Sequence, residues 1–244
     1  MKAVIQAGGK GTRLRPYTTI LPKPLMPVGG MPVIENLLKW LSRNGINRVV
    51  ITLGYLGNLI RTLCGEGNQW GVEITYSEEP EPLGTVGPLL LMRDHLEDTF
   101  LMLNGDLITD LELDAFVSFH QQNDGLVTVG TTKKSVKIDL GVIERNDDSR
   151  ITGFREKPVY TFDVSMGIYC MEPAILDLIP KGVPYGFDDL MRQMLRSGLP
   201  VHMYEHKGLW MDIGREEDFL KAQEIFMENH TSILRVHKNN DIFG

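Results

Sequence analysis

The sequence predicts an α/β fold, a three-layer α/β/α sandwich built around a mostly parallel sheet. Short apolar runs of strand length alternate along the chain with stretches that have helical spacing. Runs such as 3–5 and 99–103 are apolar almost throughout, which is typical of parallel strands covered on both faces. Alternating strands and helices of this kind form a parallel sheet with helices on either side. Ligands bind such sheets at the carboxyl ends of the strands, so the residues that follow each strand are the candidate site.

The elements of the first half follow from this periodicity. The clearest helix has Val33, Ile34, Leu37, Leu38 and Leu41 on one face and ends near 44–45, where an Asn-Gly pair favours a helix terminus. In chain order we expect strands at 3–5, 49–53, 72–76, 99–103 and 126–131, with helices at 33–41, 55–63, 87–93 and 111–121.

The pattern changes after Lys134, where short strands separated by turns replace the regular alternation. The last predicted helix, 215–227, places Phe219, Ala222 and Phe226 on one face and begins with three acidic residues. For this half we expect strands at 141–144, 151–155, 164–171, 201–204 and 209–213, with helices starting at 172–173 and spanning 187–196 and 215–227. Residues 1–227 are expected to form one domain, and 228–244 a C-terminal tail or an oligomer contact.

Composition excludes several classes of protein. The 244 residues carry a net charge of −7, which argues against a nucleic-acid partner. No apolar run approaches the roughly 18 residues needed to span a bilayer, so we expect no membrane partner. The two cysteines, Cys64 and Cys170, have no metal-ligand spacing, and the N-terminus has no leader pattern. We therefore expect a cytoplasmic protein.

The stretch after the first strand is the strongest local signal. The strand stops at Gly8, Gly9 and Gly11, and glycines let backbone N–H groups approach an anion. Cations follow closely at 13, 15 and 23, so the stretch predicts a polyphosphate cradle. Gly11 replaces the Ser or Thr of a P-loop, and the third glycine of the dinucleotide fingerprint is missing. The alternative is a glycine turn with solvated basic residues.

The motif Ala7-Gly-Gly-Lys-Gly-Thr-Arg-Leu-Arg-Pro16, followed by Pro22-Lys-Pro24, closely resembles the signature of the sugar-1-phosphate nucleotidyltransferases. The resemblance implies the nucleotide-diphospho-sugar transferase fold, with a nucleotide-binding half at 1–134 and a sugar-binding half at 135–227. It implies transfer of a nucleotidyl group from a nucleoside triphosphate to a sugar-1-phosphate, with Mg²⁺ as cofactor. Arg13 and Lys23 match the family's catalytic cations, and the nucleotide would lie on Ala7, Gly8, Gly9, Gly11, Thr12 and Arg13.

Two aspartates complete the implied catalytic set. Asp106 follows an apolar strand in Asn104-Gly-Asp, and Asp212 lies in Trp210-Met-Asp-Ile-Gly214. They resemble the family's pair of magnesium-binding aspartates, and carboxylate oxygens suit that hard cation. The alternative for each residue alone is an ordinary aspartate at a turn or strand end.

The same resemblance assigns a sugar-phosphate site. Glu156-Lys157-Pro158 matches a family motif in which the lysine holds the phosphate and the glutamate accepts from hydroxyl groups. Further positions of this site are Asn104, Gly141, Ser165 and Gly167. The alternative for Glu156 and Lys157 is an exposed pair near a turn.

The base would be recognised by the segment 78–88, through Glu79, Glu81, Pro82, Gly84 and Thr85. One carboxylate can accept from both N1–H and the 2-amino group of guanine, so the two glutamates favour GTP. The segment resembles guanylyltransferases for mannose-1-phosphate and heptose-1-phosphate, from which it departs at Pro80 and Val86.

Three alternatives remain at this point. The enzyme could transfer a thymidylyl, uridylyl or cytidylyl group to glucose-1-phosphate, and Glu78 and Glu79 could be solvated acids before a loop. A non-catalytic regulatory subunit that binds nucleotide sugars would have lost charged site residues. All five charged positions implied by the resemblance are intact, however: Arg13, Lys23, Asp106, Lys157 and Asp212. Assembly as a homo-oligomer is left open.

Overall fold

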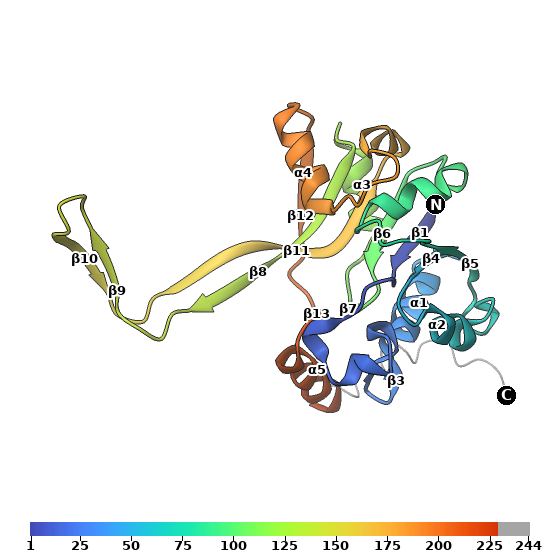
Figure 1. Ribbon diagram of the computed structural model, residues 1–244, viewed down its shortest axis with the longest axis horizontal. Helices are drawn as coiled ribbons and strands as arrows, with labels where there is room; N and C mark the ends of the chain where they lie inside the picture. The colour runs from blue at the N-terminus through green and yellow to red at the C-terminus, as the bar shows by residue number, and fades with distance from the viewer. Residues whose placement is uncertain (229–244) are drawn as a thin grey trace.

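The computed structural model describes residues 1–228, and its core is a seven-stranded sheet with the order β12-β8-β11-β6-β1-β4-β5 (Figure 1). Pairing is parallel from β6 through β1 and β4 to β5, and again between β8 and β12. Only β11 runs antiparallel to both of its neighbours. The prediction of a mostly parallel sheet is therefore confirmed. The strands are β1 (Lys2–Gln6), β4 (Arg48–Leu53), β5 (Glu73–Glu78), β6 (Phe100–Asn104), β8 (Val127–Lys137), β11 (Val159–Met171) and β12 (Val201–Glu205).

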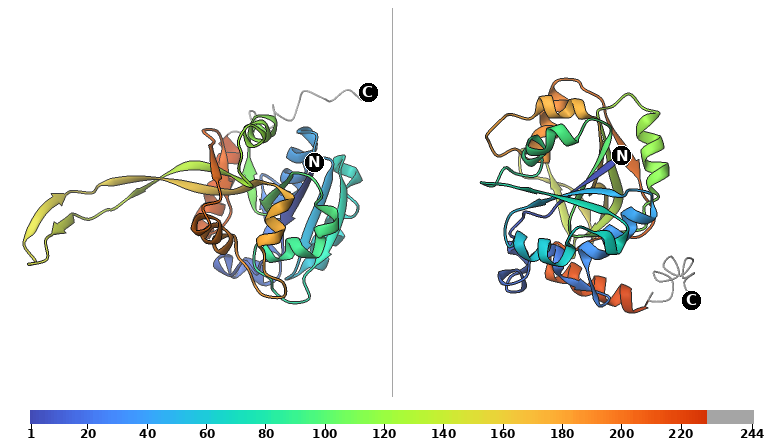
Figure 2. Two further views of the ribbon diagram at one scale, coloured as in Figure 1. Left: turned by 90° about the horizontal axis from the view of Figure 1, so that it is seen from above. Right: turned by 90° about the vertical axis from the view of Figure 1, so that its right-hand side faces the viewer.

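Helices cover both faces of this sheet, as Figure 2 shows. The pleat of β1 sends Ala3 and Ile5 to one face and Val4 to the other, and all three side chains are fully buried. One face packs on α1 (Val33–Arg43), α2 (Gly57–Cys64) and α3 (Leu113–Gln121). The other packs on α4 (Phe187–Arg196) and on 3-10 helices at Gly87–His95 and Pro173–Leu178. The three-layer prediction is confirmed.

A third apolar cluster binds the C-terminal helix to the N-terminal loop region. Phe219, Ala222 and Phe226 of α5 (Glu216–Glu228) are buried, as the predicted helix face requires. They pack with Leu14 and Ile213. The hairpin of β2 (Pro27–Val28) and β3 (Met31–Pro32) lies at the same place. The loop that follows β1 therefore rests on a packed base.

Element boundaries differ from the predictions in small ways. The helices predicted from 55 and 111 begin at Gly57 and Leu113, and the helix predicted at 87–93 is a 3-10 helix with non-helical angles at Met92. The predicted strand 209–213 is β13 (Trp210–Asp212), and it pairs with a strand that the sequence did not suggest, β7 (Leu107–Thr109).

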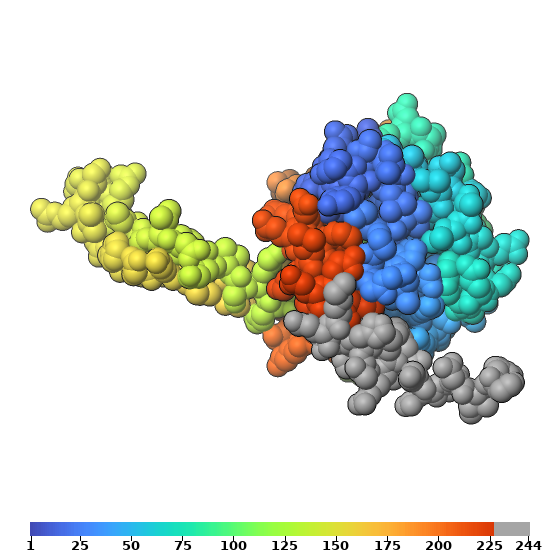
Figure 3. Space-filling model, turned by 90° about the horizontal axis from the view of Figure 1, so that it is seen from below, coloured from blue at the N-terminus to red at the C-terminus, as the bar shows by residue number. Residues whose placement is uncertain are grey.

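The largest difference from the predictions lies between β8 and β11. Both strands continue beyond the sheet as a two-stranded ribbon, at whose end β9 (Val142–Arg145) pairs with β10 (Ile151–Arg155). We call residues 133–163 the arm; it stands out from the body in Figure 1, in the left view of Figure 2 and in Figure 3. We expected residues 1–227 to form one domain with a sugar-binding half at 135–227. The elements β12, β13, α4 and α5 do pack on the core, but the arm does not.

Two remaining expectations concern the chain outside the sheet. The segment 228–244, expected to be a tail or an oligomer contact, lies outside the described residues except for Glu228. Within residues 1–228, no helix combines the length and the apolar character needed to cross a bilayer.

Candidate functional site

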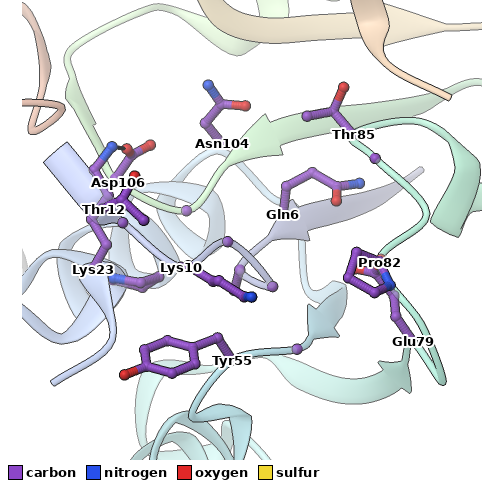
Figure 4. A pocket seen from close by; sticks show the side chains of 18 of the residues that line it. Gln6, Lys10, Thr12, Lys23, Tyr55, Glu79, Pro82, Thr85, Asn104 and Asp106 are labelled. Carbon is purple, nitrogen blue, oxygen red and sulfur yellow. Dashed lines mark ion pairs between the residues drawn. The ribbon is translucent and has the colours of Figure 1, made fainter. Parts of the chain in front are cut away.

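A cleft of about 850 Å³ opens at the carboxyl ends of β1, β4 and β6, where a parallel sheet binds its ligands. Figure 4 shows its two ends, with Thr12, Lys23 and Asp106 at one and Glu79, Pro82 and Thr85 at the other. The residues predicted for the nucleotide, the catalytic cations and the metal all line this cleft, and so does one sugar-site residue, Asn104. They are Ala7, Gly8, Gly9, Gly11, Thr12, Arg13, Lys23, Glu79, Glu81, Pro82, Gly84, Thr85, Asn104, Asp106 and Asp212.

The glycine loop is shaped to bind an anion. Among the described residues, the N–H groups of 8–11 donate to no protein acceptor, whereas the N–H of Ala7 is taken by Thr52 of β4. Gly11 has φ +58°, a conformation that a β-carbon disfavours, and Thr18 anchors it by donating to its carbonyl oxygen at 2.8 Å. The loop thus presents free donors on a fixed backbone, which is the arrangement that binds phosphate oxygens.

The predicted aspartates lie together because β7 and β13 pair antiparallel. The register sets Asp212 opposite Leu107, directly after Asp106. The N–H of Ile213 donates to the carbonyl oxygen of Asp106 at 3.1 Å, which fixes the two turns against each other. Two residues far apart in the sequence therefore share one end of the cleft.

Lys23 lies between these carboxylates. Its ammonium forms an ion pair with Asp106 and lies 3.5 Å from Oδ1 of Asp212. Burial lowers the pKa of Lys23, and the Asp212 carboxylate opposes that shift. The prolines on either side restrict the backbone, so the lysine side chain starts from a stiff base.

This end of the cleft fits a magnesium ion. Oδ1 of Asp212 is a buried oxygen without a hydrogen-bond partner among the described residues, and Asp106 is 8% exposed. No group of three or more His, Cys, Asp or Glu side chains suited to a metal occurs in the described part of the chain. Two carboxylates with an open side match a cation that takes its other ligands from phosphate and water.

The other end of the cleft is closed by residues 79–85. Glu79 accepts a hydrogen bond from the N–H of Leu83 at 2.9 Å and lies against Gly8. Burial raises the pKa of Glu79, and the bond from Leu83 opposes the shift. Thr85 accepts from the N–H of Phe187 at 2.7 Å. Glu79 thus joins two loops of the cleft, whereas Glu81 is exposed and makes no such bond within the described residues.

Four further residues that were not predicted also line the cleft: Gln6, Lys10, Gly54 and Tyr55. Gln6 is the last residue of β1, and its Nε2 is buried without a partner among the described residues. Gly54 and Tyr55 follow β4, the parallel neighbour of β1. The rule that ligands gather at carboxyl strand ends could have identified all four, because each follows or ends one of these adjacent strands.

The predicted sugar-site residues separate into two groups. Asn104 lines the cleft, and Gly167 packs against its side chain with φ +71°. Ser165 accepts from the N–H of Gly167 at 3.2 Å and lies at the base of the arm.

The second group of sugar-site residues lies out on the arm. Gly141 lies there beside the Phe154 ring and the Glu156 carboxylate, and Lys157 follows at the turn before β11. The cleft lining contains none of Gly141, Glu156 and Lys157. Within one chain the structure therefore does not bring these residues to the cleft.

Comparisons with known proteins agree with this geometry. The family model for nucleotidyl transferases matches residues 2–229. A mannose-1-phosphate guanyltransferase of Yarrowia lipolytica is 36% identical over 94% of this chain and 65% of its own length. A UTP–glucose-1-phosphate uridylyltransferase of Synechocystis sp. is 33% identical over 91% and 62%. The chain thus spans slightly less than two thirds of these curated relatives.

Solved structures show the same fold. A protein from Bacillus anthracis, described as a glucose-1-phosphate thymidylyltransferase, superposes with a TM-score of 0.74 and 25% identity. The match covers 92% of this chain and 94% of the other. HddC from Yersinia pseudotuberculosis superposes with a TM-score of 0.73 and 25% identity, over 92% and 99% of the two chains.

Proposed function

Because this chain belongs to the nucleotidyl transferase family, we propose that it joins a nucleoside triphosphate to a sugar-1-phosphate and releases pyrophosphate. The observation that carries the proposal is the meeting of Asp106, Asp212 and Lys23 beside the glycine loop in one cleft. We further propose GTP with mannose-1-phosphate or a heptose-1-phosphate as the preferred pair. The two glutamates of the 79–85 segment and the guanyltransferase relatives support that preference.

In this reaction the protein contributes mainly by positioning the two substrates and neutralising the charge of their phosphates. A phosphate oxygen of the sugar-1-phosphate attacks the α-phosphorus and forms a new P–O bond. The bond from that phosphorus to the β-phosphate bridging oxygen breaks, and pyrophosphate leaves with the electron pair. The attacking oxygen is already anionic at neutral pH, so no side chain has to remove a proton.

The residues of this chain have distinct parts in that scheme. The N–H groups of 8–11 would hold the β- and γ-phosphates, and the forked guanidinium of Arg13 would neutralise the departing pyrophosphate. Lys23 would neutralise the reacting phosphates, which compete with Asp106 for its ammonium. Asp106 and Asp212 would hold Mg²⁺, which, when bound, would supply Lewis-acid stabilisation of charge on the α-phosphate.

We also keep the assignment of the sugar-phosphate group to Asn104, Gly167, Ser165, Gly141, Glu156 and Lys157 as part of the proposal. Asn104 supports it by position, because it lines the cleft, and Gly167 packs against the Asn104 side chain. Lys157 would bind the sugar phosphate as a point charge, and Glu156 would accept from sugar hydroxyl groups.

A second substrate pair is favoured by one specific relative. The Synechocystis protein named as a UTP–glucose-1-phosphate uridylyltransferase matches this chain nearly as well as the guanyltransferases do. Uridylyl transfer to glucose-1-phosphate is therefore the alternative within the class.

Pyrophosphate release tests the proposal directly. The protein should be incubated with Mg²⁺ and each of GTP, dTTP, UTP, CTP and ATP, against mannose-, glucose- and heptose-1-phosphates. We expect release with GTP and one of the two favoured sugars. Release only with UTP and glucose-1-phosphate would replace the substrate assignment while keeping the reaction. A folded protein that releases no pyrophosphate with any of these substrate pairs would contradict the proposed reaction for these sugar phosphates.

Glu81→Gln should relax the choice of base. The exposed Glu81 carboxylate is free to accept from guanine N1–H and the 2-amino group, and an amide loses one acceptor for that pair. We expect the ratio of kcat/KM for GTP over UTP to fall about tenfold, which corresponds to about 1.4 kcal/mol. Glu79→Gln serves as the comparison, because Glu79 already accepts from Leu83. A base preference unchanged in both variants would contradict recognition by a carboxylate.

Gln6→Leu should weaken discrimination between keto and amino bases. Thr52 donates to Oε1 of Gln6 at 3.0 Å, which leaves the buried Nε2 as an unused donor on a residue that lines the cleft. That donor suits guanine O6 or uracil O4, and it opposes the amino groups of adenine and cytosine. We expect KM for the preferred keto nucleotide to rise about tenfold. Equal KM values in Gln6→Leu and the wild type would remove Gln6 from base recognition.

A further inference from the structure

We propose that two copies of this chain exchange their arms, so that Glu156 and Lys157 of one copy complete the sugar-phosphate site in the cleft of the other. This inference rests on the proposed function, because it concerns the same reaction. It assigns the arm to a second copy of this chain as its partner.

The arm is an amphipathic ribbon with one apolar face. The register pairs Val136 with Tyr160 and Lys134 with Phe162, so Val136, Tyr160 and Phe162 share a face. The opposite face is polar, with a Ser135–Thr161 hydrogen bond and a Lys133–Asp163 ion pair.

The end of the arm repeats this division. Phe154 pairs with Ile143 on one face, and an Arg155–Glu144 ion pair lies on the other. Phe154 is 63% exposed and Leu140 is 73% exposed. An isolated two-stranded ribbon is marginal in water, and exposed apolar side chains that gather on one face mark an interface. The arm therefore needs a surface to cover it.

Lys157 is too far from the cleft of its own chain. β11 is paired in extended form from Val159 to Ser165, and a strand rises about 3.3 Å per residue, so this stretch spans roughly 20 Å. Ser165 lies at the cleft end of that stretch and Lys157 beyond its far end. Figure 1 and the left view of Figure 2 agree that the arm points away from the body.

The place where the arm begins suits an exchange. β6 and β8 both run antiparallel to β11, so the two are parallel, and β8 leaves the sheet at the edge where the cleft opens. In a dimer with two-fold symmetry, the arm of each chain can then reach the cleft of the other chain. No arm and no cleft is left unpaired, so the assembly is closed. The arm carries seven Lys and Arg against six Asp and Glu, in a chain whose net charge is −7. A slightly basic arm on an acidic body is electrostatically complementary.

Complementation between two inactive variants tests the exchange. Asp106→Asn damages the cleft and leaves the arm intact, whereas Lys157→Asn damages the arm and leaves the cleft intact. Asn is chosen because Lys157 has φ +44°, a conformation that Asn tolerates. The two chains should carry different tags, be expressed together and be purified through both tags.

If the arms are exchanged, turnover should recover in the mixed dimer to a defined level. One of its two sites combines the intact cleft with the intact arm, so the mixed dimer should show about half of the wild-type turnover. Each parent should be at least a hundredfold less active than the wild type. A mixed dimer as inactive as its parents would overturn the exchange, and so would failure of the two tags to copurify. The turnover of the wild type distinguishes the two kinds of failure. If the proposed function is wrong, the wild type is inactive as well; if only the exchange is wrong, the wild type is active and the mixed dimer is not.

A second pair of variants tests the apolar face independently. Phe154→Ser with Phe162→Ser should convert a wild-type dimer to a monomer in sedimentation and raise KM for the sugar-1-phosphate at least tenfold. Affinity for the nucleoside triphosphate should stay within twofold, because the cleft is untouched. Thr161→Ala, on the polar face of the same strand, should change neither property. A monomeric wild type, or serine variants with unchanged mass and KM, would contradict the proposal.

Discussion

Asp212→Asn should reduce turnover by a factor of at least roughly one hundred, about 2.7 kcal/mol of barrier, while leaving the fold intact. The substitution keeps the shape of the side chain and removes half of the carboxylate pair that would hold Mg²⁺. Oδ1 of Asp212 has no hydrogen-bond partner among the described residues, and Lys23 keeps its ion pair with Asp106 when the Asp212 charge is removed. Pyrophosphate release at saturating substrates gives the turnover, and thermal unfolding reports on the fold.

Asp110→Asn is the matched control for this variant. Asp110 follows β7, the strand that pairs with β13, and it pairs with His206 at 2.9 Å without lining the cleft. It should change turnover less than twofold. The Asp212→Asn melting temperature should stay close to that of the wild type, because the substitution removes both the repulsion from Asp106 and the attraction to Lys23. Full turnover in Asp212→Asn would remove this residue from the mechanism.

Arg13→Met should be the second severe variant, with kcat lowered roughly a hundredfold to a thousandfold. A donor that stabilises charge developing in a transition state contributes about 3–4 kcal/mol. Arg13 lines the cleft beside the glycine loop, and its exposure means that removing it leaves no cavity. Single-turnover kinetics would separate the loss in the chemical step from any change in nucleotide binding.

Arg15→Met is the control that the chain itself supplies. Arg15 lies two residues further on, is also exposed and does not line the cleft. It removes the same charge from the same segment, so a general electrostatic effect would appear equally in both variants. We expect kcat within twofold of the wild type for Arg15→Met, and comparable losses in the two variants would contradict a specific role for Arg13.

Much of the cleft could be predicted because its residues follow buried strands. The apolar run of β6 ends next to Asp106, and β1 ends next to the glycine loop, so topology alone places these residues at one edge. β7 was not predicted, since its three residues after the Asn104-Gly105-Asp106 turn are too few to show a strand periodicity. Without β7, the sequence could not say how Asp212 reaches Asp106; only the family resemblance paired them.

The arm escaped prediction for a different reason. Residues 126–131 and 164–171 have the apolar content of buried strands, but the residues between them alternate apolar and polar side chains as a half-covered strand does. Such a pattern shows that one face is covered and does not show by what. Local periodicity could not distinguish a ribbon that packs on its own sheet from one that leaves it.

The pairing of β7 with β13 also has a consequence for synthesis of the chain on the ribosome. Residues 1–106 contain the glycine loop, Lys23 and one aspartate, whereas the second aspartate and α5 emerge more than a hundred residues later. The N-terminal part of a domain is available to fold first during translation. A nascent chain therefore has its glycine loop before it has a complete pair of carboxylates, and the proposed transfer would begin only when the final strand and helix have docked.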